Sequence, residues 1–146
     1  MSSSNSFERL ILKHLLRNEG IPIVGGAGPY IGLSVTDPGE DGTTPTEPVG
    51  NGYARVPLLD SNGQGFPAWL AATIDAADGD SIFNDNDIIW PVATGDWGVL
   101  DWWFIAAGEL EIGEAIYSSG QLSTARDVKA GERLRFAAGT FAITAE

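Results

Sequence analysis

The chain has 146 residues, of which 43% are hydrophobic, and this suits a single domain with one core. The absence of cysteine excludes disulfides, thiolate catalysis and zinc–thiolate sites, and a formal net charge of -12 disfavours direct binding to nucleic acid, whose phosphates it would repel. The 19 glycines and 8 prolines follow no fixed period and predict a turn-rich β fold, an antiparallel β-sandwich or small jelly-roll-like barrel.

The first twenty residues are expected to form an N-terminal α-helix. Asn5 and Glu8 have the spacing of an N-cap pair, and apolar residues recur at helical spacing after them. Leu12 and Leu16 widen the apolar arc beyond what one sheet face covers, so the helix either packs inside its own domain or also docks on a neighbouring subunit. Its apolar run is too short to span a bilayer and lacks a cleavage site, so we predict neither membrane insertion nor a signal peptide.

Short strands separated by turns are expected along the rest of the chain. The polar segment 39–52 has almost no large apolar side chain and is predicted to be an exposed loop. The pattern over 61–86 is ambiguous, and a short helix over 67–77 is one reading of it. Glycine-rich connections predict antiparallel pairing of strands at 30–35, 53–58, 88–92, 99–106, 114–118, 133–136 and 141–144.

The acidic segment 75–87 is the strongest candidate for a metal site. When it is aligned on an EF-hand loop from Asp78, the position that requires glycine holds Phe83 and the position of the closing glutamate holds Ile89. The match fails, so we predict a solvated acidic turn, with no metal and no cofactor.

Catalytic motifs are also weak. The single histidine, His14, lies among leucines on the expected helix, and no phosphate-binding glycine motif is present. Asp96 and Asp101 are a pair of carboxylates of the kind that glycosidases use, but one sequence gives no sign of a cleft around them. We therefore predict no catalytic residue.

Aromatic residues concentrate in Gly95–Phe104, which holds three tryptophans, and Trp90 lies just upstream. In a strand, Trp102 and Phe104 would lie on one face and Trp103 on the other, so both faces would be apolar. This surface could form the core, a subunit interface or a sugar-binding platform. The candidate interface residues are Leu12, Leu16, Trp90, Trp97, Trp102, Trp103 and Phe104.

Several motifs occur along the chain in this order: IGLSVTDPGED, GNGYARV, NDNDIIWPVATGDWGVLDWWFI and IYSSGQLSTARDVKAGERLRFAAGTFAIT. As a set they resemble a family of small phage virion proteins often labelled phage tail fibre protein. The resemblance covers roughly Leu10 to Thr144. Where the family tends to have a histidine and a glycine after the Trp-Gly turn, this chain has Asp101, Trp102 and Trp103.

The resemblance implies a virion location, and physical size helps to choose the role. A compact domain of this length spans only some tens of ångströms, and no heptad run or internal repeat is present to build a long shaft. We expect residues 1–146 to form one domain of a non-enzymatic structural protein, made in the host cytoplasm and assembled on the capsid or tail exterior. We favour a capsid decoration or cement protein; the alternative is a short tail fibre or tail adaptor involved in host-receptor attachment. The expected partners are further copies of the chain, for example in a trimer, and phage capsid or tail proteins.

Overall fold

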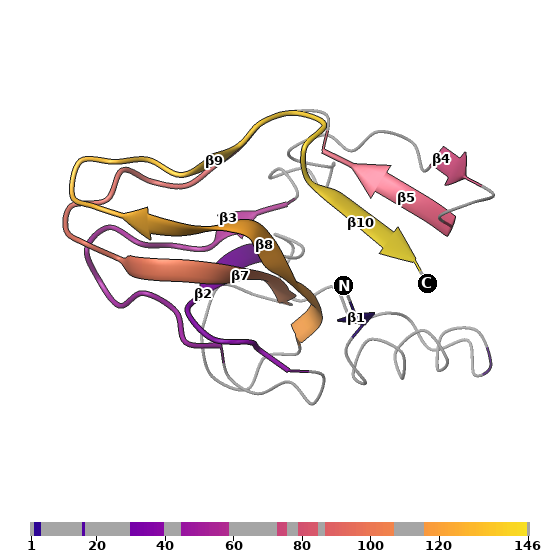
Figure 1. The fold of residues 1–146 in the computed structure, drawn as a ribbon, viewed down its shortest axis with the longest axis horizontal. Coiled ribbons are helices and arrows are strands. Elements are labelled where there is room, and N and C mark those ends of the chain that lie inside the picture. Colours follow the sequence, from indigo (N-terminus) through magenta and orange to yellow (C-terminus); the bar gives the residue numbers. More distant parts are fainter. Residues whose placement is uncertain are drawn as a thin grey trace.

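The fold is mainly β and is built from antiparallel sheets (Figure 1). The computed structural model describes residues 2–3, 16, 30–39, 45–58, 73–75, 79–84, 87–106 and 116–145. The largest sheet has five strands in the order β1 (Ser2–Ser3), β8 (Ile116–Val128), β7 (Gly98–Ala106), β2 (Tyr30–Ser34) and β3 (Val56–Pro57). A second sheet contains β10 (Ala142–Ala145), β5 (Gly79–Phe83) and β4 (Thr73–Asp75), and a third contains β6 (Ile88–Ile89) and β9 (Arg135–Phe136).

These sheets confirm the predicted antiparallel, sandwich-like fold class. Strand β8 continues to Val128, well beyond the predicted end at residue 118. The helical reading of 67–77 is wrong at 73–75, which form β4 because they pair with β5. The N-terminal helix predicted over residues 1–20 is wrong at residues 2–3, which form β1 because they pair with β8. Leu16 is also described, and the other residues of this range lie outside the described part of the chain. Within the described part of the chain, no helix is long and apolar enough to cross a bilayer.

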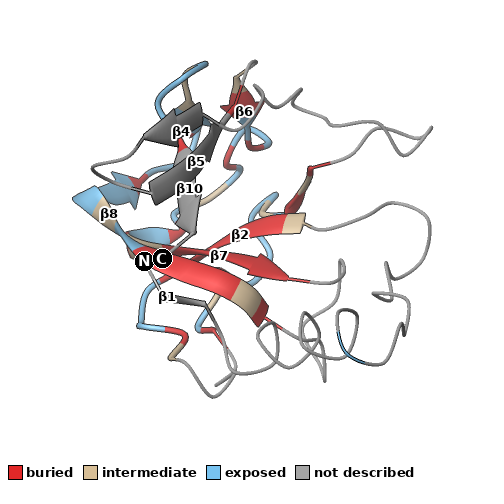
Figure 2. Ribbon diagram, turned by 90° about the vertical axis from the view of Figure 1, so that its right-hand side faces the viewer, coloured by how far each residue is buried: buried red, intermediate tan, exposed pale blue. Residues whose placement is uncertain are grey.

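The hydrophobic core joins the five-stranded sheet to the chain around β6 and β9. Figure 2 shows β2 and β7 largely buried, whereas the far half of β8 is exposed. The side chains that meet in this core are Ile31, Leu33, Val56, Leu58, Ile88, Trp90, Ala93, Trp97, Leu100, Trp103, Ile105, Val128, Leu134 and Phe141. A smaller buried cluster contains Phe104, Ala106 and Ile116. Both clusters draw on β7, so its two faces are apolar, as the sequence predicted.

An irregularity in the pairing of β7 with β8 sets which side chains of β7 reach the main core. Leu100 pairs with Arg126 but Trp102 pairs with Gln121, so residues 122–125 of β8 stand against Asp101 alone. Strict alternation would place Leu100 and Trp103 on opposite faces. Because the register shifts at Asp101, both side chains lie in the same core.

Two glycines in neighbouring strands make room for the large rings of β7. Trp103 lies opposite Gly120, where an added Cβ would be 2.7 Å from a carbon of the indole ring. Phe104 lies opposite Gly32, where an added Cβ would be 2.3 Å from the phenyl ring. Each ring therefore lies across the backbone of the next strand, which only glycine permits.

Candidate functional site

The predicted interface residues fall into two groups. Trp90, Trp97, Trp103 and Phe104 are buried within the single chain, each with 7% or less of its surface exposed. Trp102 is partly exposed, Leu16 is 79% exposed, and Leu12 lies outside the described residues. Most of the aromatic surface is therefore covered by the chain itself.

Two of the sequence motifs pack against each other at one end of the sheet. The Trp97 indole Nε1 donates a hydrogen bond to the Asn51 carbonyl (2.9 Å), and the Thr94 amide donates to the same oxygen (2.9 Å). Asn51 adopts a left-handed conformation (φ 52°), and an added Cβ at Gly95 would lie 2.6 Å from the Asn51 side chain. The loops that contain GNGYAR and WPVATGDWG are therefore held together by hydrogen bonds and close packing, and the Trp97 indole makes one of these hydrogen bonds.

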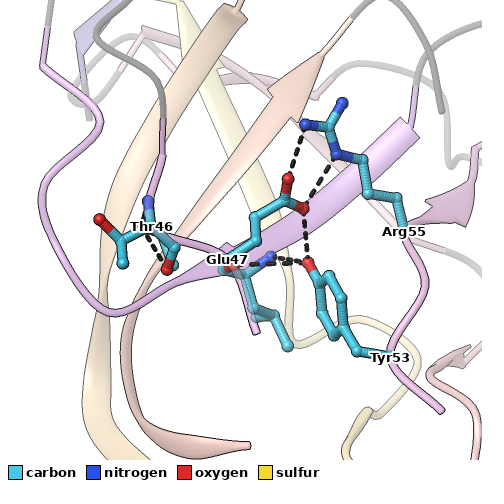
Figure 3. A network of polar contacts seen from close by, with 6 residues as sticks. Thr46, Glu47, Tyr53 and Arg55 are labelled. Carbon is cyan, nitrogen blue, oxygen red and sulfur yellow. Dashed lines mark hydrogen bonds and ion pairs between the residues drawn. The ribbon is translucent and has the colours of Figure 1, made fainter. Parts of the chain in front are cut away.

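A buried polar network lies beside these loops (Figure 3). The Arg55 guanidinium binds the Glu47 carboxylate through two hydrogen bonds, Nε to Oε1 (2.9 Å) and Nη2 to Oε2 (2.7 Å), and both side chains are nearly inaccessible. The guanidinium carbon also lies 5.0 Å from the centre of the Phe104 ring. This pair gives Arg55 a structural role. The loop predicted over 39–52 is exposed at Val49, whereas the side chain of Glu47 is buried.

Tyr53 links the ion pair to the edge of the sheet. Its hydroxyl accepts a hydrogen bond from the Leu33 amide (2.8 Å) and donates one to Glu47 Oε1 (2.9 Å). Strand β3 pairs with β2 only at residues 30 and 31, so beyond them the tyrosine hydroxyl bonds to β2 in place of β3. On its other edge β2 pairs with β7, where Leu33 lies opposite Trp103. Burial raises the pKa of the Tyr53 hydroxyl, and the negative charge of Glu47 raises this pKa further.

The carboxylates that sequence reasoning weighed for chemistry have structural partners. Asp96 accepts a hydrogen bond from the Ala130 amide (3.1 Å), and this bond, assisted by the charge of Lys129, lowers the pKa of Asp96. Asp101 accepts a hydrogen bond from the Gln121 amide group (2.9 Å). Asp87, from the acidic segment, binds Arg135 (2.9 Å). Among the described residues, no group of three or more His, Cys, Asp or Glu side chains is arranged so that it could hold a metal ion.

An open groove of about 550 Å³ lies between the far half of β8 and the chain from β9 onward. Its base is aromatic: Trp103 meets Phe141 edge to face, and Phe141 stacks on Phe136. The other lining residues are Gln121, Leu122, Ser123, Thr124, Arg126, Arg135, Ala137 and Thr140. We call this feature the β8–β9 groove.

Sequence reasoning missed the polar wall of the groove because it ended the strand at residue 118. One feature of the sequence could have drawn attention to Arg126. No lysine or arginine occurs from Val56 to Ala125, so Arg126 is the first cation after a long gap. The polar run QLSTAR that leads to it faces the groove.

The sequence matches the model of a protein family described as podophage GP4 fiber I protein gp80, over residues 2–144. The match spans nearly the whole chain and confirms the resemblance that the motifs indicated. No curated protein sequence matches the chain.

Proposed function

The chain belongs to the family of the podophage GP4 fiber I protein gp80, a family of phage fibre structural proteins, and from this premise we propose that it is a compact module of a tail fibre. The proposal rests on the family match over residues 2–144, because a match of that extent leaves little of the chain for an unrelated role.

The geometry is compatible with a rigid structural module. Glu47 and Arg55 lock the loop end of the sheet in a bidentate pair, and Trp97 clamps two further loops together. The described carboxylates hold backbone amides or cations in place. Such contacts make the loops rigid. We propose that this rigid domain has a structural role in the virion and no catalytic role.

Decoration of the capsid is the second candidate. It is favoured by the short, compact sheet and by the lack of a heptad or repeat from which to build a shaft. The family description reverses the order in which the sequence alone ranked the two roles, since it names a fibre.

Cosedimentation with separated capsids and tails of the source phage tests both roles. We expect the purified protein to sediment with tails that lack it and not with capsids. Retention on capsids alone would overturn the tail proposal in favour of decoration. Tails that already carry the protein are the matched control, because their sites are filled.

We also propose that the chain assembles with further copies of itself. Among the predicted interface residues within the described chain, Trp102 and Leu16 keep exposed apolar surface. Both are suited to anchor a contact between subunits, and neither is needed to fill the main core.

A further inference from the structure

One wall of the β8–β9 groove is fixed by contacts outside the groove. The β8 wall lies where the pairing with β7 is irregular, so residues 122–125 have only Asp101 opposite them. On the other wall, the buried Asn84 side chain donates to the Ala137 carbonyl (3.0 Å) and accepts from the Phe141 amide (2.9 Å). Asp87 accepts from the Ala138 amide (2.9 Å). The wall formed by the chain after β9 is therefore in place before any ligand arrives.

The aromatic base of the groove offers a small apolar platform. Phe136 is only partly buried, and it is held between Trp90, which meets it edge to face with centroids 5.0 Å apart, and Phe141, which stacks on it at 5.7 Å. Leu122 is also partly exposed on the opposite wall. Phe136 lines the groove and keeps part of its ring surface exposed there, so this part can contact an apolar ligand.

The rim of the groove offers hydrogen-bonding groups of the kind that bind hydroxyls. Gln121, Ser123 and Thr124 lie on the exposed part of β8, and Thr140 lies on the opposite side. The volume of about 550 Å³ is in the range of small-molecule sites. Polar groups around an apolar platform suit a pyranose ring, which has one apolar face and a rim of hydroxyls.

Arg126 contributes a positive charge to the lining of the groove. Lys129 is paired with Asp96 and Asp127, and Arg135 is paired with Asp87. Arg126 is exposed and its side chain forms no ion pair with a described residue, yet it lines the groove. An exposed guanidinium at this position favours a ligand that carries a carboxylate, because the guanidinium can bind it through two parallel hydrogen bonds.

We propose that the β8–β9 groove binds an acidic saccharide of the uronic acid class. A sugar ring lies against Phe136, its hydroxyls bond to Ser123, Thr124 and Gln121, and its carboxylate pairs with Arg126. This inference goes beyond the proposed function, which concerns where the protein sits on the virion.

Titration calorimetry of the purified full chain with trimers of galacturonic acid and of glucuronic acid tests the proposal. We expect at least one trimer to bind, and its methyl ester, which keeps the ring and removes the charge, to bind roughly tenfold more weakly. Arg126→Gln should produce a similar loss, and Ser123→Trp, which fills the groove from an exposed position, should abolish binding.

Arg133→Gln is the matched control, because Arg133 is exposed and near Arg126 in sequence but does not line this groove. It should leave the affinity close to that of the wild type. The proposal is overturned if neither acid binds at millimolar concentration, if the ester binds as well as the acid, or if Arg126→Gln and Arg133→Gln weaken binding equally. None of these results changes the outcome of the cosedimentation with tails, so the two proposals fail separately.

Discussion

Gly120 determines whether the second tryptophan of the Trp-Trp pair can enter the core. The Trp103 indole lies directly over the Gly120 backbone, and both are buried. The ring of Trp103 is accommodated because residue 120 has no side chain.

Gly120→Ala should therefore destabilise the fold. The added Cβ would lie 2.7 Å from the Trp103 ring, and the resulting overpacking should cost about 1–3 kcal/mol in the free energy of unfolding. Chemical denaturation measures the cost. In a Trp103→Leu background the same substitution should cost less, and an equal cost in both backgrounds would show that the ring contact is not the cause.

Tyr53 predicts how stability depends on alkaline pH. Its pKa is raised in the folded state, so the folded protein holds this proton more tightly than the unfolded chain does. Its contribution to stability is then complete below about pH 10, the ordinary tyrosine value, and is lost as the pH rises above it.

Unfolding free energies measured from pH 7 to 11.5 should fall at the alkaline end, with up to about 1.4 kcal/mol per pH unit arising from this one group. Tyr53→Phe should be less stable at neutral pH, because the Leu33 amide loses its hydrogen bond, yet its alkaline slope should be shallower. Identical slopes in the two proteins would contradict this assignment.

The turn after β9 depends on a side chain far away in sequence. Asn84 lies just after β5, and its buried amide bonds to both Ala137 and Phe141. This one residue therefore joins the three-stranded sheet, the groove wall and the start of β10.

Asn84→Ala should loosen this turn. We expect a loss of about 1–3 kcal/mol in the free energy of unfolding for each buried group left unsatisfied, and faster hydrogen exchange at the Phe141 amide. Exchange measured by NMR should increase at 137–141 while the β2–β7 pairing keeps its protection. Uniform acceleration across both regions would mean that Asn84 supports global stability only.

At the scale of the whole molecule, two neighbouring tryptophans lie in different environments. Trp103 lies in the main core, whereas Trp102 points away from it and keeps part of its surface exposed. The two positions differ by one residue and carry the same side chain, so they form a matched pair.

Trp103→Ala should lower the free energy of unfolding by about 3–5 kcal/mol. Trp102→Ala should lower it by roughly 1 kcal/mol or less and should instead weaken self-association. Sedimentation velocity and thermal denaturation of both variants check this. If Trp102→Ala leaves the oligomeric state unchanged, the proposed interface does not include Trp102.

The sequence by itself determined the β class, the antiparallel pairing, most strand positions and the family, because these follow from local periodicity, turn residues and the order of short motifs. It missed β4 and β5, where apolar residues follow neither period and pairing with a distant strand decides the structure.

Only the tertiary structure decided which aromatic residues are core and which remain exposed. Strand alternation cannot anticipate the register shift at Asp101, which depends on how β8 pairs with β7. The groove has the same origin: Trp103, Arg126 and Phe136 come from three different strands, and no local pattern relates them. Long-range pairing brings such residues together, because the energy that fixes the register comes from packing across the sheet and not from the residues next to one another in the chain.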